Sequence, residues 1–195
     1  MAANGKLQGK DLITTGIYTA LYIVAMFVSS VANVTPMTFM FYPAVASLLG
    51  AVFFVMLTSK VQKFGPVIIW GVIVGLLYLV LGMGATLPFF VVGSIIAQAI
   101  IAKGGYKSMR ATTVAYVIAS VFAIGGYSQL FLFTDQYLQE AVRRGLTDSF
   151  VANLGSFATT EFLLAMVVAT AVCALLGCLF SKAVLGKKLE KTGVA

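Results

Sequence analysis

The residues with which this chain could do chemistry are few. Its 195 residues include no histidine, which removes the commonest general base and the commonest metal ligand. Cys173 and Cys178 lie five apart in an apolar segment, too far around a helix for an easy disulfide, and we interpret them as small buried side chains. No ionisable residue lies near the middle of an apolar segment, as membrane enzymes and proton relays require.

Motifs for nucleotide or metal chemistry are missing as well. The sequence has no glycine-rich phosphate loop with lysine, no metal-ligand cluster and no nucleophile paired with a base. We therefore expect no catalytic residue, no metal site and no cofactor of its own, and we expect that the chain does not hydrolyse ATP by itself. An isolated membrane enzyme is the least favoured function.

Side chains suited to binding an apolar ligand are present. The connections 33–41 and 84–88 carry no charge, and together with Tyr42, Met83, Phe89 and Phe90 at their ends they supply many Met and aromatic residues, which give adaptable contacts. With residues farther along the chain they form the candidate substrate-binding set: Asn33, Met37, Phe39, Met40, Tyr42, Met83, Phe89, Tyr127, Gln129, Tyr137 and Glu161. Two alternatives stay open, namely that the aromatic connections rest in the lipid interface and that Glu161 only complements the N-terminus of the last helix.

Gly16 and Ala20 form a second candidate site, for a protein partner. Four residues apart on a helix, they lie on one face, and their small side chains let another helix backbone approach closely. The alternative is that this face packs against a neighbouring helix of the same chain.

The elements that position these residues are membrane helices. The chain is 61% hydrophobic and 10% charged, with a mean hydropathy of +1.02, which indicates an integral membrane protein. Six apolar segments predict an all-α bundle of six transmembrane helices in one domain, 1–195, with spans near 12–32, 41–59, 66–83, 87–102, 110–133 and 158–182.

Basic residues predict the orientation. All but two of the 13 Lys and Arg residues fall at one set of helix ends, and the exceptions are Arg143 and Arg144. Because positive charge resists translocation, both termini are predicted to be cytoplasmic, and the net charge of +7 requires no nucleic acid.

The connection 134–157 is longer than a simple link requires. We expect an amphipathic helix in it, capped by Asp135 and ended by Gly145, that acts as a lid over a pocket, with a hinge at Gly125 and Gly126. A helix lying on the lipid headgroups is the alternative. Gln98, in the middle of an apolar segment, is expected to link two helices by hydrogen bonds.

Length, topology and the small-residue face of the first helix resemble the substrate-binding S-components of energy-coupling factor (ECF) transporters, which are ABC importers. More narrowly, several motifs resemble the MptD (Trep_Strep) group of that class. They are the phrase from Lys10 to Ala20, the tract through Gly71, Gly75 and Gly82, the residues Tyr106, Ser108 and Arg110, and the ending Gly186-Lys187-Lys188-Leu189 with Lys191 and Gly193.

The resemblance implies a mechanism. Gly16 and Ala20 would occupy the two small positions at which the first helix packs against a membrane T-component, while two cytoplasmic ATPase subunits supply energy. The chain would capture its substrate outside the bacterial cell membrane and topple in the bilayer to release it. Met and Tyr in the presumed pocket favour haem or a corrinoid such as cobalamin as substrate, and a smaller vitamin or an aromatic compound is the alternative. A different class of function is also open: a non-transporting accessory protein that regulates a partner through helix one.

Overall fold

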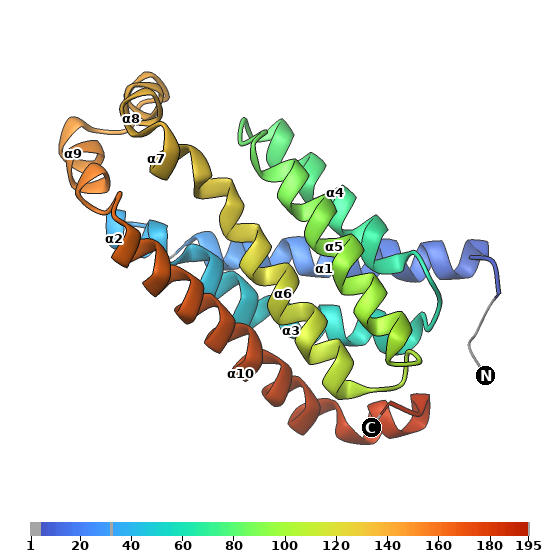
Figure 1. Ribbon diagram of the computed structural model, residues 1–195. Helices are drawn as coiled ribbons and strands as arrows, with labels where there is room; N and C mark the ends of the chain where they lie inside the picture. The colour runs from blue at the N-terminus through green and yellow to red at the C-terminus, as the bar shows by residue number, and fades with distance from the viewer. Residues whose placement is uncertain (1–4, 32, 195) are drawn as a thin grey trace.

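The computed structural model describes residues 5–31 and 33–194, in which every regular element is a helix (Figure 1). The α-helices are α1 (Gly9–Ser30), α2 (Pro36–Met40), α3 (Tyr42–Lys60), α4 (Pro66–Val80), α5 (Thr86–Lys103), α6 (Met109–Ala123), α7 (Ser128–Leu132), α8 (Thr134–Arg143), α9 (Asp148–Ser156) and α10 (Thr160–Thr192), and a 3-10 turn, η1 (Ile124–Tyr127), joins α6 to α7. The all-α prediction is confirmed. Ala32, at the end of the predicted span 12–32, lies outside the described residues, as do residues 1–4 and 195 of the predicted domain.

Five segments of the described chain are long and apolar enough to cross a membrane. They are α1, α3, α5, the run Met109–Leu132, and Thr160–Gly186 within α10. The predicted span 66–83 is shorter than expected: α4 has 15 residues, and the chain leaves the helix before Gly82, whose φ of +80° is unfavourable for other residues. A sixth crossing by α4 and the direction of insertion stay predictions.

The predicted span 110–133 is not one continuous helix. It turns at η1, where the hinge was expected, and continues as α7. A Cβ on Gly125 would collide with the ring of Phe89, and one on Gly126 would come 2.5 Å from the Thr86 hydroxyl. The glycine pair therefore lets the chain pass close to the start of α5 as it changes direction.

Close helix contacts depend on glycine. Gly177 of α10 lies so near α3 that an added Cβ would come 2.7 Å from the carbonyl oxygen of Leu48. Gly71 of α4 is equally close to α5, since a Cβ there would come 2.9 Å from the Phe90 carbonyl oxygen. Backbone groups cannot retreat as flexible side chains do, so these positions fix the spacing of both helix pairs.

The core is aromatic. Trp70 packs edge-on against Tyr22 and Phe54, with ring centroids 5.0 Å and 5.2 Å apart, and Phe54 lies 4.7 Å from Tyr116. These side chains come from α1, α3, α4 and α6, so one cluster ties four helices together.

Gln98 links α5 to the start of α4, as predicted. Its side chain is 1% exposed, and its Oε1 accepts hydrogen bonds from the backbone N–H groups of Gly65 and Val67, both at 3.1 Å. The first turn of any helix leaves N–H groups without partners, and this amide satisfies two of them inside an apolar environment.

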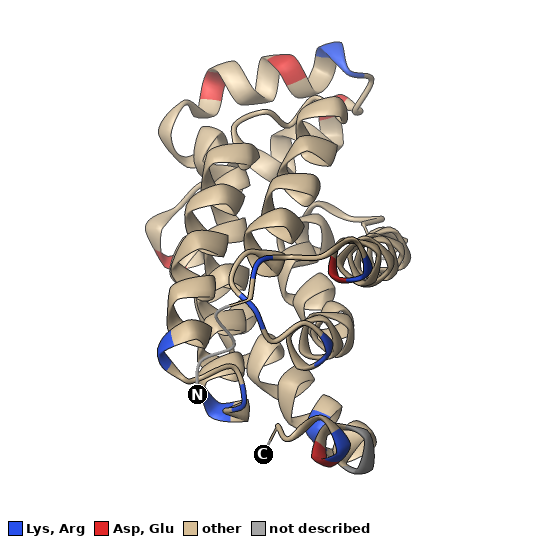
Figure 2. Ribbon diagram, turned by 90° about the vertical axis from the view of Figure 1, so that its right-hand side faces the viewer, with Lys and Arg blue, Asp and Glu red and all other residues tan. Residues whose placement is uncertain are grey.

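Charges divide between the two ends of the bundle. Figure 2 shows most Lys and Arg positions in the half of the bundle that holds both termini. At the other end, α8 carries Asp135 and Glu140, with Arg143 and Arg144 at its C-terminal end. We call these the basic end and the lid end. This division is the pattern from which a cytoplasmic basic end was predicted.

Gln98→Met should destabilise the protein while keeping the side-chain volume. Two buried N–H groups would lose their partner, each at a cost of about 1–3 kcal/mol, so the melting temperature in detergent should fall by several degrees. Gln139→Met on α8, where the side chain is exposed, is the control and should leave the melting temperature nearly unchanged. Equal melting temperatures for both variants would show that the Gln98 bridge is unimportant.

Candidate functional site

A cavity of about 800 Å³ opens at the lid end of the bundle. Its wall comes from α1, α3, α4, α5, α6 and α8, and its volume falls in the range typical of small-molecule sites. The residues that line it include Tyr22, Met26, Asn33, Phe39, Tyr42, Ser47, Tyr78, Met83, Phe90, Ser120, Tyr127, Gln129, Gln136, Tyr137, Glu140 and Arg144. Most are aromatic or uncharged polar side chains.

Linked tyrosines form the deep wall. The Tyr78 hydroxyl donates to the Tyr42 hydroxyl at 3.3 Å, and Tyr42 donates in turn to the Met26 carbonyl oxygen at 3.4 Å. The Tyr78 ring stacks on Phe90 with a centroid separation of 5.5 Å. Three helices thus present fixed ring faces and phenol oxygens, which suits an aromatic or apolar ligand with neutral polar groups.

The lid consists of α8 and α9, of which the sequence predicted only the first. Gly145 ends α8 with a φ of +89°, and Leu146 donates back to the Ala141 carbonyl oxygen at 3.1 Å, as predicted for a glycine C-cap. The prediction that Asp135 caps α8 is wrong. Phe133 holds the capping position, and Asp135 lies in the first turn, where its charge complements the helix N-terminus.

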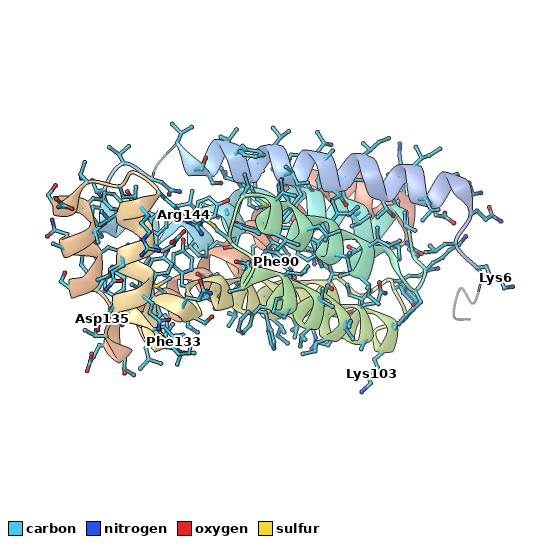
Figure 3. The ribbon with its side chains drawn as sticks, turned by 90° about the horizontal axis from the view of Figure 1, so that it is seen from above. Lys6, Phe90, Lys103, Phe133, Asp135 and Arg144 are labelled. Carbon is cyan, nitrogen blue, oxygen red and sulfur yellow. The ribbon has the colours of Figure 1, made fainter. Side chains whose placement is uncertain are left out.

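Arg144 fastens the lid across the cavity mouth. Its Nη1 donates to the Gly82 carbonyl oxygen in the turn between α4 and α5 at 3.0 Å, and its Nε donates to Glu140 Oε1 at 3.0 Å. Figure 3 shows Phe133, Asp135 and Arg144 at the lid end, Lys6 and Lys103 at the opposite end, and Phe90 between them. Burial raises the pKa of Tyr137 on the same helix, so its phenol stays protonated and able to donate at neutral pH.

The base of the lid is held by aromatic contacts. Tyr127 donates from its hydroxyl to the Phe39 carbonyl oxygen at 2.8 Å, and the two rings meet edge to face at 5.7 Å. Phe39 also contacts Phe150 of α9, with centroids 6.2 Å apart. Helix α2 and the lid therefore share one aromatic junction.

Most of the candidate substrate-binding residues meet at this cavity. Those that line it are Asn33, Phe39, Tyr42, Met83, Tyr127, Gln129 and Tyr137. Four do not. Met37 is exposed on α2, Met40 is fully buried beside Leu130 and Leu154, and Phe89 packs against Gly125.

Glu161 is the fourth residue away from the cavity. It is exposed in the first turn of α10, one residue after the start of the helix, and Thr159 is the N-cap that accepts from Phe162 N–H at 3.3 Å. The geometry agrees with the alternative interpretation, in which the carboxylate complements the helix N-terminus.

Sequence reasoning missed the deep residues Tyr22, Tyr78 and Ser120, and it missed Arg144 at the cavity mouth. A signal existed for Tyr22: Thr15, Thr19, Tyr22 and Met26 follow helical spacing and are all buried, which marks the inward side of α1. The isolated residues Tyr78 and Ser120 have no comparable pattern around them.

The face of α1 with Gly16 and Ala20 points away from the bundle. Both residues are exposed, and a Cβ built on Gly16 meets no atom within 4 Å. Ile13, Ile17 and Val24 on the same helix are also more than half exposed. Packing of this face within the chain, the alternative considered from the sequence, is not what the structure shows.

At the basic end α1 is tied to the bundle by an ion pair. Lys63 Nζ lies 2.7 Å from Asp11 Oδ2, and Asp11 also accepts from the Gln8 N–H at 2.8 Å. Neither residue is near the cavity. Among the described residues no group of three or more His, Cys, Asp or Glu could hold a metal ion.

Comparison with known protein families identifies a match over most of the chain. The profile of the Trep_Strep family, described as a hypothetical bacterial integral membrane protein, matches residues 9–191. No curated protein and no solved structure matches the chain.

Arg144→Gln should loosen the lid. Losing the hydrogen bond to Gly82 and the pair with Glu140 removes about 1–2 kcal/mol of local stability, so amide hydrogen exchange in α8 should accelerate roughly 5- to 30-fold. Arg143→Gln is the matched control, because the Arg143 side chain is largely exposed and its contact with Glu140 is long, at 3.9 Å. If both variants exchanged at the wild-type rate, Arg144 would not fasten the lid.

Proposed function

The chain belongs to the Trep_Strep family of bacterial integral membrane proteins, and from this premise we propose that it is the substrate-binding S-component of an ECF-type ABC importer. In this role it captures a vitamin-like or tetrapyrrole-like compound and passes it to a T-component driven by two cytoplasmic ATPase subunits. The observation that carries the proposal is the combination of a cavity at the lid end and an exposed small-residue face on α1.

The cavity supports the capture step. It is large enough for a drug-sized compound and lies under a lid held by Arg144, and Glu140 and Arg144 of the lid are the only charged residues among the described residues that line it. Such a site binds and releases a compound without chemical change. Haem or a corrinoid is the favoured substrate, since tyrosines and Met26 and Met83 line the cavity and both residue types can ligate haem iron.

The α1 face supports the partner step. A glycine and an alanine four residues apart, both exposed, leave a shallow surface flanked by Ile13 and Ile17. A second helix that approaches closely there makes more packing contacts with this surface than lipid tails make. Energy must come from partners, because the sequence contains no nucleotide-binding motif.

Gly16→Leu and Ala20→Leu, combined in one variant, should disrupt assembly with the T-component and abolish uptake. Two leucines would hold the helices apart at an overpacking cost of about 1–3 kcal/mol, which weakens the complex roughly 5- to 150-fold in co-purification. The melting temperature of the isolated chain should not change, since both positions face outward.

Ala165→Leu is the control, because Ala165 is equally exposed on α10, away from α1. An intact complex and normal uptake in the double variant would contradict the proposal. Loss of a partner without any small molecule ever binding the chain would instead favour the accessory, non-transporting function.

A further inference from the structure

We propose that the cavity selects ligands that carry an uncharged hydrogen-bonding group. This group pairs with the hydroxyl of Ser120 at the deep end of the cavity. The inference rests on the proposed function and narrows the substrate class. The ligand would have an aromatic or apolar body, a neutral polar group at its buried end, and any charged groups at the end that stays at the mouth.

Ser120 is the observation that points to a ligand. It lies on α6, is 4% exposed and lines the cavity, and its Oγ has no hydrogen-bond partner among the described residues; the Tyr116 hydroxyl beside it donates instead to the Ser47 carbonyl oxygen at 2.8 Å. Other buried serines donate to a carbonyl three or four residues earlier: Ser47 to Ala44 at 2.8 Å and Ser181 to Gly177 at 2.6 Å. A buried hydroxyl without a partner is costly, and a ligand group at this point would recover that cost.

The other buried polar atoms without a partner differ in whether their residues line the cavity. Thr19 Oγ1 and Trp70 Nε1 also lack partners, but neither residue lines the cavity. Asn33 Oδ1 does line it, at the loop after α1. Two unpaired polar atoms, on α6 and in the loop after α1, therefore face the same space, and a single ligand could satisfy both.

The charge of the lining decides what the buried end can be. Of the described residues around the cavity, only Glu140 and Arg144 are charged, and both belong to the lid and pair with each other at 3.0 Å. The deep wall offers the phenols of Tyr22, Tyr42 and Tyr78 and no counterion. A carboxylate or phosphate placed there would lose its hydration without compensation, so the buried group must be neutral.

This arrangement constrains the candidate substrates. Haem would have to enter with its ring edge first, leaving both propionates at the mouth beside Arg144. The amide groups of a corrinoid are neutral and could reach Ser120 directly. A compound charged at both ends would be rejected.

Ser120→Ala separates a ligand anchor from a structural hydroxyl. Since Ser120 Oγ has no partner, the ligand-free variant should melt at the wild-type temperature or higher in detergent. A ligand that binds the wild-type chain should bind the variant about 3- to 10-fold more weakly, the usual effect of one neutral hydrogen bond. Ser181→Ala, which removes a buried hydroxyl far from the cavity, should not change the affinity.

The probes are matched pairs measured by melting-temperature shift and native mass spectrometry: riboflavin against its 5′-phosphate, and haem against haem dimethyl ester, together with cobalamin. Both members of each pair should bind the wild-type chain, because their charged groups can stay at the mouth, and each should bind Ser120→Ala more weakly; that result would support the inference. An unchanged affinity in Ser120→Ala, or a lower melting temperature of that variant without ligand, would overturn it while leaving a substrate-binding function in place. If no probe bound and no compound were taken up by cells, the proposed function itself would fail, and the ligand-free melting comparison would still decide whether the hydroxyl is structural.

Discussion

The structure depends on the close approach of helix backbones where glycine stands at the contact. Inside a bilayer, apolar surface gains little from leaving lipid, so helices stay together through packing and hydrogen bonds. Gly177 brings α10 against α3, and Gly71 brings α4 against α5, each within a distance that a side chain would prevent. With those pairs fixed, the aromatic cluster around Trp70 fills the centre, and Gln98 satisfies the start of α4.

The cavity follows from what that packing leaves unfilled. Toward the lid end, tyrosine and phenylalanine rings from several helices line the space that remains between them. Polar atoms then face the space, some linked to each other as in the Tyr42 and Tyr78 pair, and some, as in Ser120, without a partner. A neutral wall with unsatisfied hydrogen-bonding atoms suits reversible binding of an uncharged group, and the lid fastened by Arg144 lies across the mouth.

The helical class, most helix positions and part of the site could be predicted from the sequence, because length and apolar content determine membrane helices. Gln98 was predictable since an amide in an apolar segment needs a partner. How deeply each residue lies within the site could not be predicted. Met40 turns into the core because Thr35 caps the short helix α2 and sets its rotation, and Glu161 stays at the surface because Thr159 caps α10 just before it. Ser120 and Tyr78 belong to the cavity through the crossing of helices far apart in the chain, which no local pattern records.

The most direct test of the central claim, that the cavity is a ligand site, is native mass spectrometry with an absorption spectrum. The chain would be purified in detergent from cells grown in rich medium containing haem and cobalamin. We expect one small molecule bound per chain, with a Soret or corrin band if the ligand is a tetrapyrrole. A chain that is free of any small molecule and that also binds no member of a vitamin panel would contradict the assignment.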